Sequence, residues 1–132
     1  MNQWSVIIPS FGRSERLNRS LPAVLKASAQ LDAEVIVVDD GSPEPIQVPQ
    51  AEGLRLARQS NGGPASARNY GASLAGAEKI AFLDDDCEPD TEWLSRLDQG
   101  LSAWPDHIVG GKTMNGLKKS VLADTSQGVT NC

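Results

Sequence analysis

Apolar residues gather in short runs along this chain, and segments with a different spacing separate the runs. Three runs predict buried strands, because a parallel strand covered on both faces need not alternate apolar and polar residues. They are WSVIIPS (4–10), AEVIVVDDGS (33–42) and KIAFLD (79–84). GLRLARQ (53–59) alternates and predicts another strand, and HIVGGKTMNG (107–116) predicts one more, broken by a pair of glycines.

Helical spacing of apolar residues predicts three helices between these strands. In residues 14–32 leucine and valine recur at helical spacing, but Pro22 predicts a kink or a restart inside this helix. Residues 65–77 follow Pro64 and are rich in alanine, glycine and serine, so this helix can approach a sheet closely. Residues 90–104 place leucine and tryptophan on one helical side.

The order of these elements predicts the fold class. Strands alternate with helices, and such alternation favours an open, mostly parallel α/β sheet with helices on both faces. Sheets of this kind bind ligands outside the carboxyl ends of their strands. Polar motifs follow three of the predicted strand ends, and Arg68 lies near the start of a helix. We therefore expect these separate motifs to meet at one edge of the sheet.

The acidic run FLDDDCEPD contains the most distinctive of these motifs. In an extended segment alternate side chains share a face, so Asp84 and Asp86 point the same way and Asp85 points to the opposite side. Paired carboxylates without a histidine or thiolate suit Mg²⁺ or Mn²⁺. The alternative is a solvated acidic turn before the next helix.

The other two motifs each have a structural and a functional interpretation. In the DDGS motif (39–42) a carboxylate can accept hydrogen bonds from a base or a ribose, although Asp-Gly and Ser-Pro also favour a plain turn. In NGGPASARN the glycine pair precedes a helix N-terminus, where backbone N–H groups favour anions, and Arg68 suits a phosphate or a base carbonyl. A simple helix start is the alternative there.

Composition and charge narrow the class of protein. The chain has 132 residues, which suits one domain, and its net charge of −5 argues against a general nucleic-acid binder. No apolar run approaches the ~20 residues that a membrane span needs, and no signal-peptide pattern opens the chain, so we expect a cytoplasmic protein. Cys87 and Cys132 are too few for a disulfide framework, and His107 alone cannot form a histidine metal cluster.

Taken together, the motifs resemble those of the family 2 glycosyltransferases, which have the Rossmann-like GT-A fold. SVIIPSFGR is similar to the opening strand of that family, and VIVVDDGS is similar to its second-strand motif. NGGPASARNYG resembles the segment N-x-G-x-x-x-A-R-N-x-G, and IAFLDDDCEPDTEWL resembles the D-x-D element. VGGKTMNG resembles a segment that follows. The likeness covers residue 5 to about 116, and the order and spacing of the motifs make it specific.

The resemblance implies that the chain binds a nucleoside-diphosphate sugar, most simply of the UDP type, for transfer to an acceptor that the sequence does not identify. It also implies roles for individual residues: Pro9 borders the base, Asp40 accepts a hydrogen bond from a uracil-type base, Arg68 helps hold the nucleotide, Asp85 reaches the ribose, and Asp84 and Asp86 bind Mn²⁺ or Mg²⁺ at the diphosphate. A cation there would stabilise the departing nucleoside diphosphate.

The chain also departs from the family pattern. Family members run well past 200 residues, and their later half carries the acceptor site and a carboxylate that acts as general base. Asp106 and Asp124 are the only acids after the last predicted helix, and neither matches a motif, so no catalytic base is assigned. We expect residues 1–116 to be a truncated nucleotide-sugar-binding half, and 117–132 to be a tail that is poorly ordered or leads to an absent acceptor subdomain.

Two other function classes stay open at this point. A non-catalytic nucleotide-binding or oligomerisation module fits the short chain, because apolar surface left uncovered by a missing half favours a homo-oligomer. A nucleotidyltransferase would be expected to carry a glycine-rich loop with a basic residue near the first strand. PSFGRSER, with one glycine, matches that loop poorly.

Overall fold

Strands and helices alternate along the chain in the computed structural model, which describes residues 3–12, 14–103, 120–122 and 129–130. The elements are β1 (Trp4–Ser10), α1 (Ser14–Ala29), β2 (Glu34–Asp39), β3 (Leu54–Arg58), α2 (Pro64–Leu74), β4 (Lys79–Phe82), β5 (Glu88–Pro89), α3 (Trp93–Ala103), β6 (Ser120–Leu122) and β7 (Val129–Thr130). The strands predicted at 4–10, 33–42, 53–59 and 79–84 are confirmed. The strand predicted at 107–116 lies outside the described residues.

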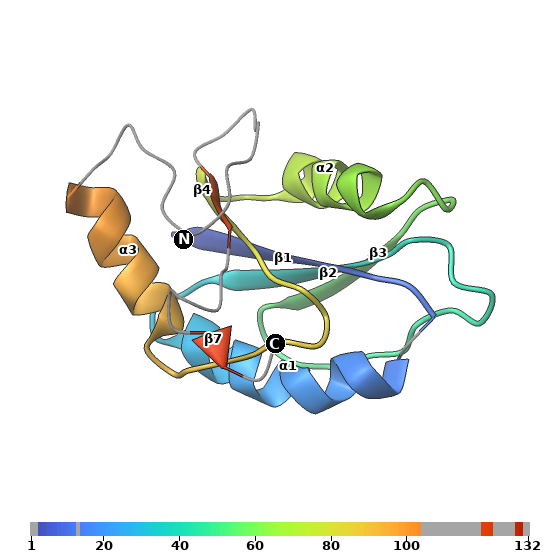
Figure 1. The fold of residues 1–132 in the computed structure, drawn as a ribbon, viewed down its shortest axis with the longest axis horizontal. Helices are drawn as coiled ribbons and strands as arrows, with labels where there is room; N and C mark the ends of the chain where they lie inside the picture. The colour runs from blue at the N-terminus through green and yellow to red at the C-terminus, as the bar shows by residue number, and fades with distance from the viewer. Residues whose placement is uncertain (1–2, 13, 104–119, 123–128, 131–132) are drawn as a thin grey trace.

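Five of the strands form one parallel sheet in the order β3-β2-β1-β4-β6 (Figure 1). β1 lies in the middle, and its last residue, Ser10, is paired with Asp39 at the end of β2. β5 and β7 make a separate antiparallel pair. The predicted open, mostly parallel sheet is therefore confirmed. The boundary predicted at residue 116 stays a prediction, and β6 and β7 both lie beyond it.

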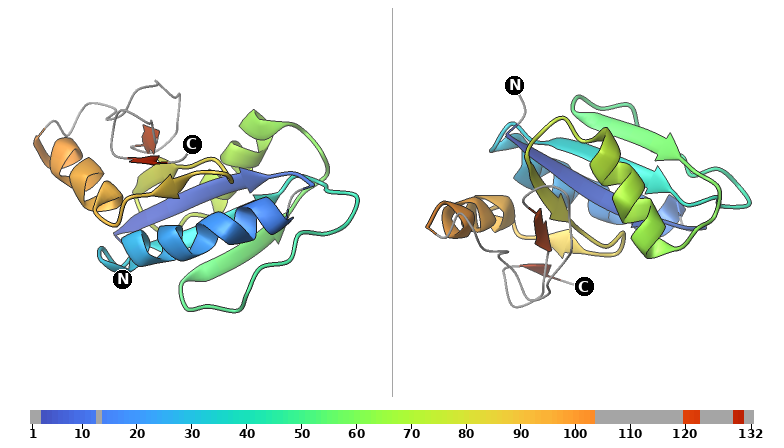
Figure 2. Two further views of the ribbon diagram at one scale, coloured as in Figure 1. Left: turned by 60° about the horizontal axis from the view of Figure 1, so that its bottom comes forward. Right: turned by 90° about the horizontal axis from the view of Figure 1, so that it is seen from above.

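Helices cover both faces of the sheet, as the element order predicts (Figures 1 and 2). Val6 and Ile8 of β1 join one buried cluster with residues of α1 and α3, whereas Ile7 joins a second cluster with Ala67 of α2. Successive side chains of a strand point to opposite faces. Burial on both faces therefore explains why the sequence of β1 is apolar without alternation.

α1 runs without interruption through Pro22, so the predicted restart is wrong. Proline supplies no N–H to the carbonyl four residues earlier. Pro22 lies on the exposed side of α1, where water can satisfy that carbonyl, while Leu21 and Val24 beside it are buried. Burial of the apolar side outweighs the missing bond. Within the described ranges, neither this helix nor any other is long and apolar enough to cross a bilayer.

α2 lies unusually close to the sheet at Gly71, which is buried against β1 and β2. A Cβ atom added at Gly71 would collide with the side chain of Ile7 and come within 3.1 Å of Val38 Cγ2. The small residues predicted to let this helix approach the sheet therefore do so, and the absent side chain of Gly71 sets the spacing. Figure 2 shows the helix crossing over the strands.

Asp39 fixes the loop that follows β2. Its carboxylate accepts hydrogen bonds from the Ser42 hydroxyl (2.6 Å), the Ser42 and Ile46 N–H groups (3.0 Å each) and Arg58 Nη1 (2.6 Å). Burial raises the pKa of Asp39, but these hydrogen bonds together outweigh burial and leave the pKa below its ordinary value. The charged carboxylate is thus the form that the folded chain stabilises.

Replacing Gly71 by alanine tests the close approach of α2. In an ordinary helix this change stabilises by ~1 kcal/mol, but the collision with Ile7 reverses the sign here, and we expect a loss of ~1–3 kcal/mol in the free energy of unfolding. Ser73→Ala, on the exposed side of the same helix, should change it by less than ~0.5 kcal/mol. Urea unfolding measures both. A Gly71→Ala protein that is more stable than the parent would contradict the close approach.

The network around Asp39 predicts a pH dependence of stability. Its folded-state pKa is lowered, so the unfolded chain takes up the proton first as the pH falls. The stabilisation is present at neutral pH and declines below about pH 4. Asp39→Asn should lower the free energy of unfolding by ~2 kcal/mol at pH 7 and flatten its acid dependence. Glu44→Gln, an exposed carboxylate in the same loop, is the control and should do neither.

Candidate functional site

A cavity of about 520 Å³ lies at the carboxyl edge of the sheet. Its volume falls within the range of small-molecule sites, roughly 300–1,000 Å³. The structure brings all of the sequence-predicted site residues to this one cavity: Pro9, Asp40, Arg68, Asp84, Asp85 and Asp86 all line it. Parallel pairing of β1 with β2 and β4 explains this, because it sets the strand ends side by side.

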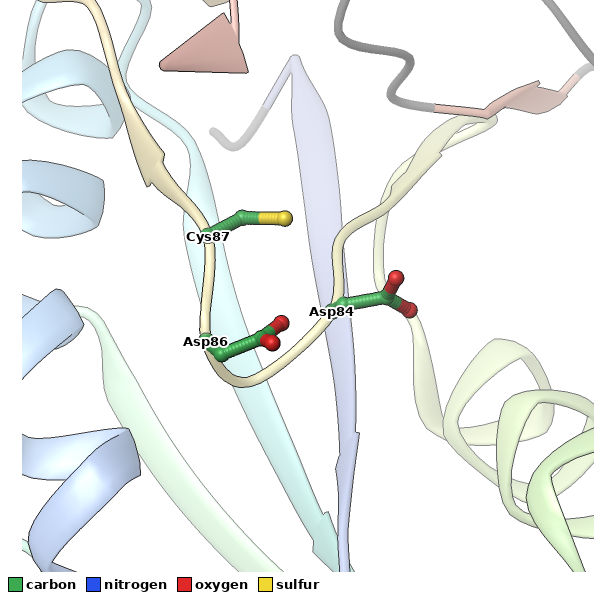
Figure 3. Close-up of side chains that lie close together, drawn as sticks. All are labelled: Asp84, Asp86 and Cys87. Atoms are coloured by element: carbon green, nitrogen blue, oxygen red, sulfur yellow. The ribbon is translucent and has the colours of Figure 1, made fainter. Parts of the chain in front are cut away.

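The acidic run forms a turn directly after β4. The Cys87 N–H donates to the Asp84 carbonyl at 3.2 Å, which closes the turn. Asp84 and Asp86 are exposed, with 65% and 41% of their side chains accessible, whereas the Asp85 side chain is only 10% exposed. Figure 3 shows the Asp86 carboxylate pointing toward Asp84. The predicted division of the three carboxylates is present, although a turn produces it and not an extended strand.

Asp85 points into the protein and is held there from two elements. Its Oδ2 accepts a hydrogen bond from Ser10 Oγ at 2.8 Å, and its Oδ1 accepts one from Arg16 Nη2 at 3.0 Å. The Asp85 carbonyl also accepts a bond from Ser20 Oγ at 2.9 Å. Each carboxylate oxygen has room for a second donor. Asp85 therefore ties the acidic turn to β1 and α1 and still borders the cavity.

Two arginines partly balance the negative charge of the cavity. Arg68 Nη2 lies 3.7 Å from Asp84 Oδ1, and Arg16 Nη1 lies 4.0 Å from Asp86 Oδ2. With Asp40 included, four carboxylates and two guanidinium groups line the cavity, which leaves two net negative charges. A single divalent cation is the simplest group that neutralises such a lining.

Asp40 organises the loop that leads into α2. Its Oδ1 accepts from Gln59 Nε2 (2.8 Å) and the Gly62 N–H (2.9 Å), and its Oδ2 accepts from the Gly63 N–H (2.9 Å) and Asn61 Nδ2 (3.3 Å). Burial raises the pKa of Asp40, but the bonds from Gln59 and the two glycines outweigh it, and the pKa lies below its ordinary value. The carboxylate is therefore charged, and it holds the start of α2 beside the cavity.

The residue between Asp40 and Ser42 has to be glycine for this arrangement. Gly41 has a φ of 74°, and a Cβ there would lie 2.5 Å from the backbone nitrogen of Asn61. The DDGS motif thus packs against the loop before α2, and its Asp39 carboxylate accepts hydrogen bonds from the Ser42 N–H and hydroxyl.

The donor set of the acidic turn fits a hard divalent cation. Carboxylate oxygens of Asp84 and Asp86 lie within 4.8 Å of each other and face the cavity. The Cys87 sulfur lies within the same 4.8 Å, but it is buried and offers no free thiol. Oxygen ligands of this kind suit Mg²⁺ and Mn²⁺, which commonly take one or two carboxylates and complete their shells with water and phosphate. Asp84 and Asp86 are therefore the residues that could hold an ion.

The sequence alone did not single out three residues that line the cavity. Phe11, with 49% of its surface exposed, follows the end of β1. Arg16 stands in the first turn of α1, and Asn61 bonds the Asp40 carbonyl at 3.0 Å. The positions of Phe11 and Arg16 could have indicated a place in the site. Phe11 directly follows the central strand, and Arg16 lies in the first turn of the helix that begins at the same edge of the sheet. Asn61 is the first residue of the NGGPASARN motif, which was its signal, although its partner Asp40 lies 21 residues away.

Comparisons with known proteins agree with this architecture. The model of glycosyl transferase family 2 matches residues 5–126. Glycosyltransferase AglE of Haloferax volcanii is 34% identical over 122 residues, which cover 81% of this chain and 38% of that protein. The chain thus spans well under half the length of this relative.

Solved structures show the same fold. Residues 1–349 of Staphylococcus aureus TarS, in complex with UDP-GlcNAc, match 88% of this chain and 37% of that chain with a TM-score of 0.64 and 22% identity. Glucosyl-3-phosphoglycerate synthase from Mycobacterium tuberculosis, in complex with Mn²⁺, UDP and glucosyl-3-phosphoglycerate, is also similar. The match covers 76% of this chain and 39% of that chain, with a TM-score of 0.56 and 18% identity. The fold is therefore GT-A, and with the family match over residues 5–126 the chain belongs to glycosyl transferase family 2.

Proposed function

We propose that this chain is the donor-binding part of a glycosyltransferase and binds a UDP-sugar together with a divalent cation. The observation that carries the proposal is the cavity at the carboxyl edge, where Asp84 and Asp86 stay exposed beside two arginines. A diphosphate next to these carboxylates is electrostatically unfavourable unless a cation lies between them. The TarS and synthase structures, which hold UDP-GlcNAc and UDP with Mn²⁺, support this choice of ligand.

The cation site consists of Asp84 and Asp86, with Mn²⁺ or Mg²⁺ as the ion. When bound, the ion supplies positive charge that stabilises the departing nucleoside diphosphate. The chain contributes the placement: the Asp85 anchor to Ser10 and Arg16 fixes the turn, so the two neighbouring carboxylates face the cavity. Arg68, 3.7 Å from Asp84, can turn from that carboxylate to a phosphate.

Other residues that line the same cavity bind the base and the ribose. Pro9 borders the base. Asp85 accepts a hydrogen bond from a ribose hydroxyl through the lone pairs that are not engaged by Ser10 and Arg16. Asp40 already accepts four bonds, but Asn61 is the most distant donor at 3.3 Å and has the Asp40 carbonyl as a second acceptor at 3.0 Å. A uracil N–H can therefore take the place of Asn61 at Asp40 Oδ2 without leaving Asn61 unpaired.

Calorimetric titration with UDP tests the proposal. We expect UDP to bind in the presence of Mn²⁺ and to bind at least ~10-fold more weakly after the metal is removed with a chelator, because the carboxylates then repel the diphosphate. An absence of binding under both conditions would rule out the proposed ligand.

A charge-neutral, isosteric variant tests the metal ligands. Asp86→Asn should weaken the metal-dependent part of UDP binding by at least ~10-fold, since even indirect partners of a metal contribute that much. Asp90→Asn serves as the matched control, because Asp90 lies four residues further along and pairs with Arg96, outside the cavity. Equal affinity of the Asp86→Asn and Asp90→Asn proteins for UDP with Mn²⁺ would refute the role given to Asp86.

A further inference from the structure

Arg16 contacts two of the three consecutive carboxylates, and the two contacts differ. Nη2 bonds Asp85 Oδ1 at 3.0 Å, and the Asp85 side chain is almost fully buried. Nη1 lies 4.0 Å from Asp86 Oδ2, and 41% of the Asp86 side chain is exposed. In the described part of the chain the Arg16 Nε atom is buried and has no hydrogen-bond partner. The guanidinium group thus has a hydrogen bond to Asp85 and a contact with Asp86 that is longer than a hydrogen bond. Its Nε donor has no partner among the described residues.

We propose that Arg16 is a positioning residue that makes cation binding and nucleotide binding depend on each other; this inference rests on the proposed function. Without the cation, Arg16 offsets the charge of Asp85 and Asp86 and holds the acidic turn together. With the cation at Asp84 and Asp86, Arg16 keeps its bond to Asp85 and releases Asp86. Its Nη1 donor then serves the diphosphate.

The geometry decides which contact Arg16 keeps. The bond to Asp85 is 3.0 Å long and its carboxylate is almost fully buried, and Ser10 donates to the other oxygen of the same carboxylate. The contact with Asp86 exceeds hydrogen-bond length and is open to solvent, so it contributes little. A cation that shares Asp86 repels the guanidinium group as well. The contact with Asp86 is therefore the one that breaks.

The charge of Arg16 then acts in opposite directions on the two ligands. It opposes the free cation, because both are positive and both lie beside Asp86. It favours the diphosphate, because a planar guanidinium group donates well to phosphate oxygens. Binding of the nucleotide therefore relieves the repulsion that the cation meets, and by linkage the cation improves the affinity for the nucleotide by the same factor.

Titration calorimetry with two probes, MnCl₂ alone and UDP at saturating Mn²⁺, separates this role from a purely structural one. Arg16→Gln should bind Mn²⁺ alone roughly three- to tenfold more tightly, the size expected for removing one charge a few ångströms from a divalent ion in water. The same variant should bind UDP at saturating Mn²⁺ at least ~3-fold more weakly, because bonds from a guanidinium group to phosphate are lost.

Two further variants make the outcome decisive. Arg19→Gln removes the same charge from the exposed side of α1, one turn further along, and should leave both affinities within about twofold. Arg16→Lys keeps the charge without the planar fork. It should leave the affinity for Mn²⁺ alone within about twofold and still weaken UDP binding.

The proposal is supported if Arg16→Gln raises the affinity for Mn²⁺ alone and lowers the affinity for UDP at saturating Mn²⁺. Equal losses of affinity for both probes would show that Arg16 only maintains the fold, and unchanged affinities would show that it has no part in the site; either result overturns the inference. Tighter Mn²⁺ binding by Arg16→Lys would overturn the charge argument. A parent protein that binds neither probe would instead refute the proposed function itself.

Discussion

Parallel pairing of β1 with β2 on one side and β4 on the other is the constraint on which the rest of the structure depends. It aligns the carboxyl ends of three strands and so brings Ser10, Asp39 and the acidic turn to one edge. β1 can occupy the middle only because both of its faces are buried, by α1 and α3 on one side and by α2 on the other. Gly71 permits the second of these contacts, and hence the packing of α2 beside the cavity depends on a missing side chain.

Five carboxylates gather at this edge of the sheet, and they fall into a buried group and an exposed group. Asp39, Asp40 and Asp85 are buried and receive several donors each, so they act as fixed anchors for loops. Asp84 and Asp86 keep 65% and 41% of their side chains exposed, and the contacts that they make with Arg68 and Arg16 are long. Anchored carboxylates define the shape of the site, and exposed ones keep their charge available. That separation is the physical reason for proposing a cation at the acidic turn.

Local patterns predict most of the fold but only part of the site. The strand at 4–10 has the bounds that its apolar run indicates. The edge strand at 54–58 is also present where predicted, but its burial does not alternate, because Leu56 is exposed. The continuity of α1 through Pro22 was not predictable, because it depends on which side of the helix faces water. The partners of Asp40 and Asp85 come from residues 19 to 75 positions away, and one-dimensional spacing carries no information about such contacts. Arg16 was missed for the same reason, although its place in the first turn of α1, the helix after β1, could have indicated that it lies at the site.

The measurement that tests the central claim most directly is an anomalous diffraction map of crystals of this chain grown with UDP and Mn²⁺. The account predicts a manganese peak at coordination distance, ~2.2 Å, from carboxylate oxygens of both Asp84 and Asp86, with the diphosphate as a further ligand. UDP bound in the cavity with no manganese peak at the acidic turn, or a peak held by other residues, would contradict it.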